Sequence, residues 1–119
     1  MRMWAFARNT GMDIKQIDDR FSTTGQIRPE QIEALAAEGY RLIVCNRPDG
    51  EDAGQPAFAE IADAAGKAGI SAVHIPMTGA PTGAQVDALR NAMAGVDGRI
   101  LGYCRSGARS QKIHAALND

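Results

Sequence analysis

Apolar residues follow two kinds of spacing along this chain. Segments with apolar residues on one helical face recur four times, and continuous apolar runs of strand length follow the first three of them. The helical segments span residues 29–39, 56–69, 82–94 and 109–117, and the apolar runs span residues 40–46, 70–76 and 99–104. Such runs are typical of strands that are covered on both faces of a parallel sheet. The pattern therefore predicts buried parallel strands connected by helices.

The stretch before the first helical segment has a shorter period. Ile14, Ile17 and Phe21 are separated by polar residues, which predicts short edge strands around a turn within residues 13–28. Pro29 then suits the first position of a helix, because its missing N–H would have no partner there.

Alternating helices and strands indicate right-handed crossovers that place helices on both faces of the sheet. We therefore expect a single α/β domain over residues 12–119, with a central, mainly parallel sheet flanked by helices. In such folds the working site lies beyond the carboxyl ends of the strands. Three loops are expected to meet there, and they cover residues 46–52, 76–83 and 104–110.

Composition narrows the class of protein. A chain of 119 residues with 45% hydrophobic and 23% charged residues suits one globular domain. The net charge of −1 gives no reason to expect a nucleic-acid or membrane partner. Two separated cysteines and the lack of a signal-like segment favour a cytoplasmic location. Residues 1–11 are expected to form an arm, whose Trp4 and Phe6 either dock on the domain or meet a partner.

The candidate chemistry lies in the segment YCRSGARS, residues 103–110. Cys104 ends a predicted strand before a tight turn into a helix, where backbone N–H groups and the helix dipole stabilise a thiolate. Arg109 can hold two oxygens of a phosphate, sulfate or thiosulfate with its planar guanidinium. Gly107 permits the left-handed backbone angle that such a loop needs. Ser110 supplies a hydroxyl and is a candidate cap for the last helix.

Further residues at the same sheet edge complete the candidate site. The predicted anion-binding residues besides Arg109 are Arg47, Arg105, Ser106, Gly107, Ala108 and Ser110. Three acids share the loop of Arg47, namely Asp49, Glu51 and Asp52. They either orient Arg47 or Arg109 by ion pairing or form a solvated acidic turn. We expect a small sulfur-containing or phosphorylated anion as the partner, no cofactor, and no metal, because no ligand spacing of a metal site is present.

Three segments resemble the beta-lactamase-hydrolase-like, phosphatase-like domain family, and together they span roughly residues 13–115. They read FSTTGQIRPEQIEALAAEGYRLIVCNRPDGEDAGQP, AGISAVHIPM and GYCRSGARS. The resemblance implies the fold of tyrosine and dual-specificity protein phosphatases, with Cys104 as the nucleophile and Arg109 as the anion-binding arginine. It also implies a kinship with sulfide detoxification, since family members often described as sulfur transferases occur fused to persulfide-dioxygenase-like domains.

Two features bear on whether Cys104 attacks phosphorus or sulfur. Tyrosine and dual-specificity phosphatases have five residues between cysteine and arginine, whereas Cys104 and Arg109 are separated by four, as in rhodaneses. These phosphatases also use a carboxylic acid on a preceding loop to protonate the leaving alkoxide, which contributes about 10²–10⁴-fold. The corresponding loop here, PMTGAPTG, has no acid. If the protein is a phosphatase, we expect Asp49, Glu51 or Asp52 to stand in for the missing donor, and Asp87 in the next helix is a further candidate.

Sulfur transfer expels leaving groups of low pKa, which depart without protonation. We therefore expect a rhodanese-type sulfurtransferase that forms a persulfide on Cys104. A phosphatase with a cysteinyl-phosphate mechanism and a non-catalytic anion-binding module remain the alternatives.

Three more residues have chemistry that could serve the site. Cys45, inside the run LIVCN, is expected in the core, and the alternative is a resolving thiol for Cys104. His74 is expected to be a hydrogen-bonded structural residue, and His114 a surface or packing residue of the last helix.

Overall fold

A five-stranded sheet forms the centre of the computed structural model, which describes residues 12–119. The strand order is β1-β2-β5-β3-β4. The strands are β1 (Lys15–Gln16), β2 (Phe21–Thr24), β3 (Tyr40–Cys45), β4 (Ser71–His74) and β5 (Arg99–Tyr103). All neighbours are parallel except β1 and β2, which are antiparallel. The expected single α/β domain with a mainly parallel sheet is confirmed.

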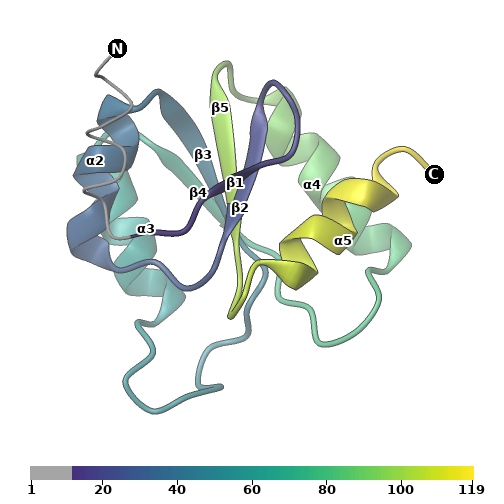
Figure 1. Ribbon diagram of the computed structural model, residues 1–119, viewed down its shortest axis with the longest axis horizontal. Helices are drawn as coiled ribbons and strands as arrows, with labels where there is room; N and C mark the ends of the chain where they lie inside the picture. The colour runs from purple at the N-terminus through teal and green to yellow at the C-terminus, as the bar shows by residue number, and fades with distance from the viewer. Residues whose placement is uncertain (1–11) are drawn as a thin grey trace.

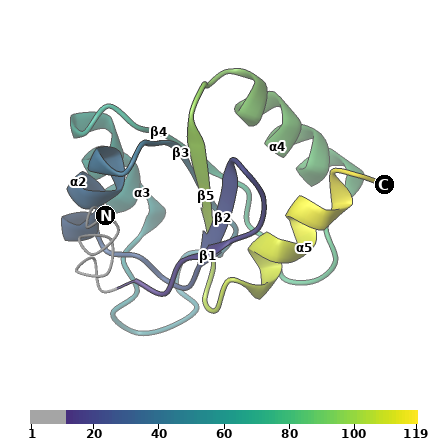
Figure 2. The ribbon, with the colours of Figure 1, turned by 45° about the horizontal axis from the view of Figure 1, so that its top comes forward.

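Helices cover both faces of this sheet. The short 3₁₀ helix η2 (Pro29–Gln31) leads into α2 (Ile32–Ala37), and the other helices are α3 (Phe58–Lys67), α4 (Gly83–Ala94) and α5 (Ala108–Ala116). Figures 1 and 2 show α2 and α3 against one face and α4 and α5 against the other. None of the helices between residues 12 and 119 is long and apolar enough to cross a membrane.

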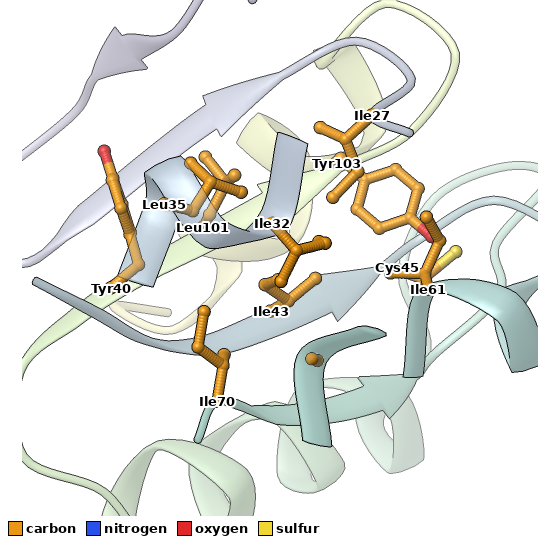
Figure 3. Close-up of a cluster of buried hydrophobic side chains, with 11 residues drawn as sticks. Ile27, Ile32, Leu35, Tyr40, Ile43, Cys45, Ile61, Ile70, Leu101 and Tyr103 are labelled. Atoms are coloured by element: carbon orange, nitrogen blue, oxygen red, sulfur yellow. The ribbon is translucent and has the colours of Figure 1, made fainter. Parts of the chain in front are cut away.

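Alternation along β3 divides its side chains between two hydrophobic clusters. Ile43 and Cys45 belong to the cluster under α2 and α3, whereas Leu42 and Val44 belong to the cluster under α4 and α5. Successive side chains of a strand point to opposite faces of the sheet, so one strand contributes to both. Figure 3 shows the first cluster, in which the Tyr103 ring lies beside Cys45.

The structure corrects the expected positions of two strands. β2 is not an edge strand, because it lies between β1 and β5 and all four of its residues are buried. Conversely, β4 is apolar in sequence but forms the edge of the sheet, and its residues are exposed or half-buried. An apolar run indicates a strand but does not indicate which strands lie beside it, so only the three-dimensional structure reveals the strand order.

The boundaries of the first and last helices also differ from the sequence pattern. The helical segment at residues 29–39 starts as a 3₁₀ turn, and α2 ends at Ala37, two residues before Gly39. Gly39 adopts φ 93°, a left-handed conformation that commonly terminates helices. The last helix begins at Ala108, one residue earlier than expected.

Candidate active site

The three loops expected to meet at the carboxyl edge of the sheet do so. The Asn46 N–H donates to the Tyr103 carbonyl at 2.8 Å, which joins the loop after β3 to the end of β5. The Met77 N–H donates to the Asn46 carbonyl at 3.2 Å, which adds the loop after β4. Cys104 follows β5 directly and continues its pairing with β2, because its N–H donates to the Thr24 carbonyl at 3.3 Å.

The Cys104 thiol lies inside a ring of backbone N–H groups. The Gly107 N–H donates to Cys104 Sγ at 3.0 Å. Burial of the thiol raises its pKa, but the backbone N–H groups of Ser110, Ser106, Arg109 and Gly107 oppose burial by hydrogen bonding, and the pKa is lowered overall. These donors stabilise the charged form, as expected for a thiol at a helix N-terminus. The loop therefore favours a thiolate at Cys104.

Two glycines allow the loop to close around the thiol. Gly107 precedes α5 with φ 95°, a left-handed conformation that disfavours other residues. A Cβ atom on Gly25 would lie 2.9 Å from the carbonyl oxygen of Arg105, closer than packing allows. The turn after β2 therefore approaches the backbone of the Cys104 loop as closely as a glycine permits.

The structure changes the role expected of Ser110. The residue before α5 is Gly107, so Ser110 is not the helix cap but a buried residue of the first turn. Its hydroxyl donates to Asn46 Oδ1 at 2.8 Å, and the Asn46 amide donates in turn to the Ile75 carbonyl at 3.0 Å. Ser110 thus ties α5 to the loop after β3, while its backbone N–H reaches the thiol.

The guanidinium of Arg109 faces acceptors on both neighbouring loops. Its Nη1 donates to Glu51 Oε2 at 3.0 Å and to the Met77 carbonyl at 2.7 Å, and its Nη2 donates to Glu51 Oε1 at 2.8 Å. The pKa of Arg109 is raised, first by the hydrogen bond to Glu51 and further by the charge of Cys104 nearby. The predicted nucleophile and the predicted arginine are therefore brought together.

Glu51 joins Arg109 to a second arginine. Arg47 Nε donates to Glu51 Oε1 at 2.9 Å. The hydrogen bond from Arg109 is the largest cause that lowers the pKa of Glu51 to about 2, and Arg47 adds to it. The predicted ion pairing of an acid of this loop with Arg47 or Arg109 is therefore present, because Glu51 pairs with both arginines. Glu51 is ionised at neutral pH.

The other two acids of the loop have different partners. Asp52 Oδ2 accepts from Arg47 Nη2 at 2.5 Å and lies 3.3 Å from Arg105 Nε. Asp49 Oδ1 accepts from the Phe58 N–H at 2.8 Å, so this carboxylate caps the first turn of α3. The alternative of a solvated acidic turn also holds in part, because Asp49 and Asp52 both lie exposed in this turn while Asp52 takes part in ion pairs.

The remaining predicted residues occupy distinct places around the loop. The Arg47 side chain is only 3% exposed, and its Nη1 donates to Gln26 Oε1 at 2.8 Å. The side chain of Arg105 is 67% exposed, and the hydroxyl of Ser106 accepts from the Ala108 N–H at 3.3 Å. Their binding of an anion stays a prediction.

Cys45 lies in the core as expected. The residue is 2% exposed, and burial raises the pKa of its thiol. Cys45 is paired in register with Tyr103, so Cys104 is the next residue along, where side chains alternate to the opposite face. Both cysteines are free thiols, and a resolving role for Cys45 stays a prediction.

The two histidines belong to the structural framework. His74 Nε2 is hydrogen-bonded to the Arg47 carbonyl at 2.8 Å, and its ring stacks on Phe58. His114 Nε2 lies 2.7 Å from Asp18 Oδ2, and its ring packs on Phe21. Within residues 12–119 no group of three His, Cys, Asp or Glu side chains is arranged to hold a metal ion.

Sequence reasoning missed three contributors to the site. Gly25 permits the close approach to the loop, Gln26 holds Arg47, and Met77 supplies a backbone carbonyl to Arg109. Gly25 directly follows β2, and a glycine at a strand end in this fold is a signal that could have been used. A carbonyl carries no side-chain signal, so Met77 could not have been found.

The site is thus a buried cysteine after the central strand β5, with backbone amides around its thiol and Arg109 beside it. A sequence model of the beta-lactamase hydrolase-like protein, phosphatase-like domain, matches residues 13–118. The chain belongs to this family.

Curated relatives and solved structures agree with this assignment. The chain is 34% identical over 105 residues to a beta-lactamase hydrolase-like protein of Xylella fastidiosa and 33% identical over 104 residues to one of Agrobacterium fabrum. Each match covers 87% of this chain and 24% of the relative, so the chain spans about a quarter of the length of these proteins.

The solved structures with this fold include phosphatase candidates and a tyrosine phosphatase. A candidate phosphatase of Neisseria meningitidis superposes with a TM-score of 0.77 and 29% identity, covering 88% of this chain and 75% of that one. A candidate phosphatase of Shewanella putrefaciens also has a TM-score of 0.77, with 19% identity and coverages of 92% and 73%. The active form of Tk-PTP has a TM-score of 0.60, 21% identity and coverages of 88% and 80%.

These findings bear unequally on the two chemical hypotheses. The family description and the solved neighbours name phosphatases, and none of these matches names sulfur transfer. They support the phosphatase alternative better than the sulfurtransferase hypothesis, and they establish the phosphatase-like scaffold.

Proposed function

We propose that Cys104 is the nucleophile of a sulfurtransferase built on this phosphatase-like scaffold. One observation carries the proposal over a phosphatase: the acid beside the loop is held ionised. Glu51 accepts from both Arg47 and Arg109, and its pKa is about 2. A carboxylate in this state cannot donate the proton that a leaving alkoxide needs.

The other acids near the site are also engaged with partners, and Asp49 Oδ1 accepts from the Phe58 N–H. The loop between β4 and α4, residues 75–82, contains no Asp or Glu. Asp87 is exposed on α4 and pairs with Arg90 at 3.4 Å. Asp52 is paired with Arg47 and Arg105.

Sulfur transfer fits the groups that are present. The Cys104 thiolate attacks the outer sulfur of the donor, the donor's S–S bond breaks, and the electron pair leaves on sulfite or a thiolate. These leaving groups have low basicity and depart without a proton. The outer sulfur remains on Cys104 as a persulfide, which the thiolate of an acceptor then removes by the same kind of attack. No proton donor and no cofactor are required.

The second candidate is a phosphatase, and the similarity to phosphatase structures favours it. The same thiolate would attack phosphorus and form a cysteinyl phosphate, with Arg109 binding the oxygens. Asp52, beside Arg105 of the loop, would then be the acid to test. A domain that binds anions without catalysis is the remaining alternative.

One experiment separates these functions. The purified protein is incubated in parallel with thiosulfate, an organic persulfide and an aryl phosphate, and its intact mass is measured with Cys104→Ser as the control. The proposal predicts the addition of sulfur, lost in Cys104→Ser. Robust hydrolysis of the aryl phosphate without a persulfide would establish the phosphatase instead. Anion binding with neither adduct would leave the non-catalytic module.

A further inference from the structure

The guanidinium that should bind the substrate is already paired with a carboxylate. Arginine has five N–H donors, and at least three of those on Arg109 are taken, two by Glu51 and one by the Met77 carbonyl. The pair is bidentate, the geometry in which arginine binds carboxylates and phosphates most strongly. An incoming oxyanion therefore meets an arginine whose charge is largely compensated.

Glu51 is held in place from its other side. Arg47 donates to it through Nε, and Arg47 is itself buried and fixed by Gln26 and Asp52. Moving Glu51 away from Arg109 would also strain its hydrogen bond to the buried guanidinium of Arg47. The carboxylate should therefore remain beside Arg109 when a substrate binds.

The charges around the loop balance. The guanidinium groups of Arg47, Arg105 and Arg109 pair with the carboxylates of Glu51 and Asp52, and Arg109 also lies near the charge of the Cys104 thiolate. These six groups carry a net charge of zero, so a dianion would enter a cluster with no excess positive charge. Like charges a few ångströms apart repel strongly where water is partly excluded. The arrangement disfavours a dianion next to Glu51.

We propose that Glu51 is a specificity-determining residue, which neutralises Arg109 so that the loop selects an organic persulfide over dianions such as thiosulfate or phosphate monoesters. This inference rests on the proposed sulfur transfer and names its donor. In the step, the Cys104 thiolate attacks the outer sulfur of R–S–SH and the inner sulfur leaves as the thiolate R–S⁻ with the bonding electron pair. The outer sulfur stays on Cys104 with its proton, so no oxidant or reductant is needed.

Binding of sulfate tests the charge argument independently of catalysis. Sulfate is an inert dianion, and its dissociation constant can be measured from the protection of Cys104 against iodoacetamide at constant ionic strength. Rates are normalised to those without sulfate, so that a change in thiol reactivity cancels. Glu51→Gln should bind sulfate at least about tenfold more tightly than the native protein, a factor equivalent to about 1.4 kcal/mol.

Two variants serve as controls for this measurement. Glu33→Gln makes the same charge change on the exposed surface of α2 and should leave sulfate binding within about twofold. Asp52→Asn keeps the pair between Glu51 and Arg109 and should strengthen sulfate binding by less than Glu51→Gln does. Unchanged or weaker binding by Glu51→Gln would show that Glu51 only positions Arg109, and an equal effect of Asp52→Asn would assign the selectivity to overall charge. Either result overturns the proposal.

The choice of donor is tested by kinetics. The native protein should have a higher kcat/KM for glutathione persulfide than for thiosulfate, and Glu51→Gln should shift this ratio towards thiosulfate by at least about tenfold. A native preference for thiosulfate would contradict the proposed donor. If neither donor forms a persulfide on Cys104, the proposed function fails together with its donor, and the sulfate measurement alone decides whether Glu51 excludes dianions.

Discussion

The two cysteines lie at the ends of neighbouring strands, yet their surroundings act on them in opposite directions. Cys45 ends β3 and packs in the hydrophobic cluster under α2 and α3, where burial raises the pKa of its thiol. Cys104 follows β5 and is equally buried, but four backbone N–H groups lower its pKa despite the burial. The difference shows that the direction of the backbone amides, rather than exposure to solvent, decides whether the pKa of each thiol is raised or lowered.

The largest expected effect separates the two cysteines by substitution. Cys104→Ser should reduce sulfur transfer by at least about 10³-fold, because the nucleophile is lost. Cys45→Ala should keep the activity within a few-fold and cost about 1–2 kcal/mol of stability through the small cavity it leaves. Rates of persulfide formation and urea denaturation check both. Loss of activity in folded Cys45→Ala would assign Cys45 a role in the reaction.

A backbone substitution tests whether the amides matter. Gly107→Ala places a side chain on a residue with φ 95°, which costs about 1–2 kcal/mol and should turn its N–H away from Cys104. We expect sulfur transfer to fall by about tenfold. Gly69→Ala is the matched control, since Gly69 has φ 79° with open space around it and lies before β4. Equal kinetic effects of the two variants would contradict the role of the Gly107 amide.

A smaller effect is expected when only the hydroxyl of Ser110 is removed. Ser110→Ala deletes the hydrogen bond to Asn46 and leaves a buried acceptor without it, which should destabilise the protein by about 1–3 kcal/mol. The backbone N–H that reaches Cys104 remains, so the rate of sulfur transfer should change less than about threefold. A larger kinetic loss in the folded variant would mean that the hydroxyl itself acts in the reaction.

The smallest expected effect concerns the acid dependence of stability. The pKa of Glu51 is depressed from an ordinary value of 4.5 to about 2, so its stabilising contribution is complete above about pH 4.5. It is lost as the pH falls through about 2, because the unfolded chain binds the proton first. Urea denaturation between pH 5 and pH 2 should therefore show a steeper loss for the native protein than for Glu51→Gln. Parallel curves would contradict the ion pair.

The meeting of the three loops at the carboxyl ends of the strands and the Cys104 loop itself could be predicted from the sequence, because both depend on local signals. Apolar runs identified β3 and β5, and the spacing of Cys104, Gly107 and Arg109 indicated the turn that closes around the Cys104 thiol. The position of β4 at the sheet edge depends on strand order, which no local pattern encodes.

The ion pair between Glu51 and Arg109 depended on the fold in the same way. The two residues are separated by 58 positions in the chain, and sequence alone left open whether an acid of this loop pairs with Arg47 or with Arg109. The structure shows that Glu51 pairs with both, and this finding bears most strongly on the choice between phosphorus and sulfur.

The rate of alkylation of each cysteine as a function of pH tests the central claim most directly. Peptide mass spectrometry after brief exposure to iodoacetamide reports both thiols in the same sample. Cys104 should react with a midpoint below the ordinary thiol pKa of about 8.5, well below that of Cys45, and Arg109→Ala should move the Cys104 midpoint upwards. Coincident midpoints for the two cysteines, or a Cys104 midpoint above that of a free thiol, would contradict the account.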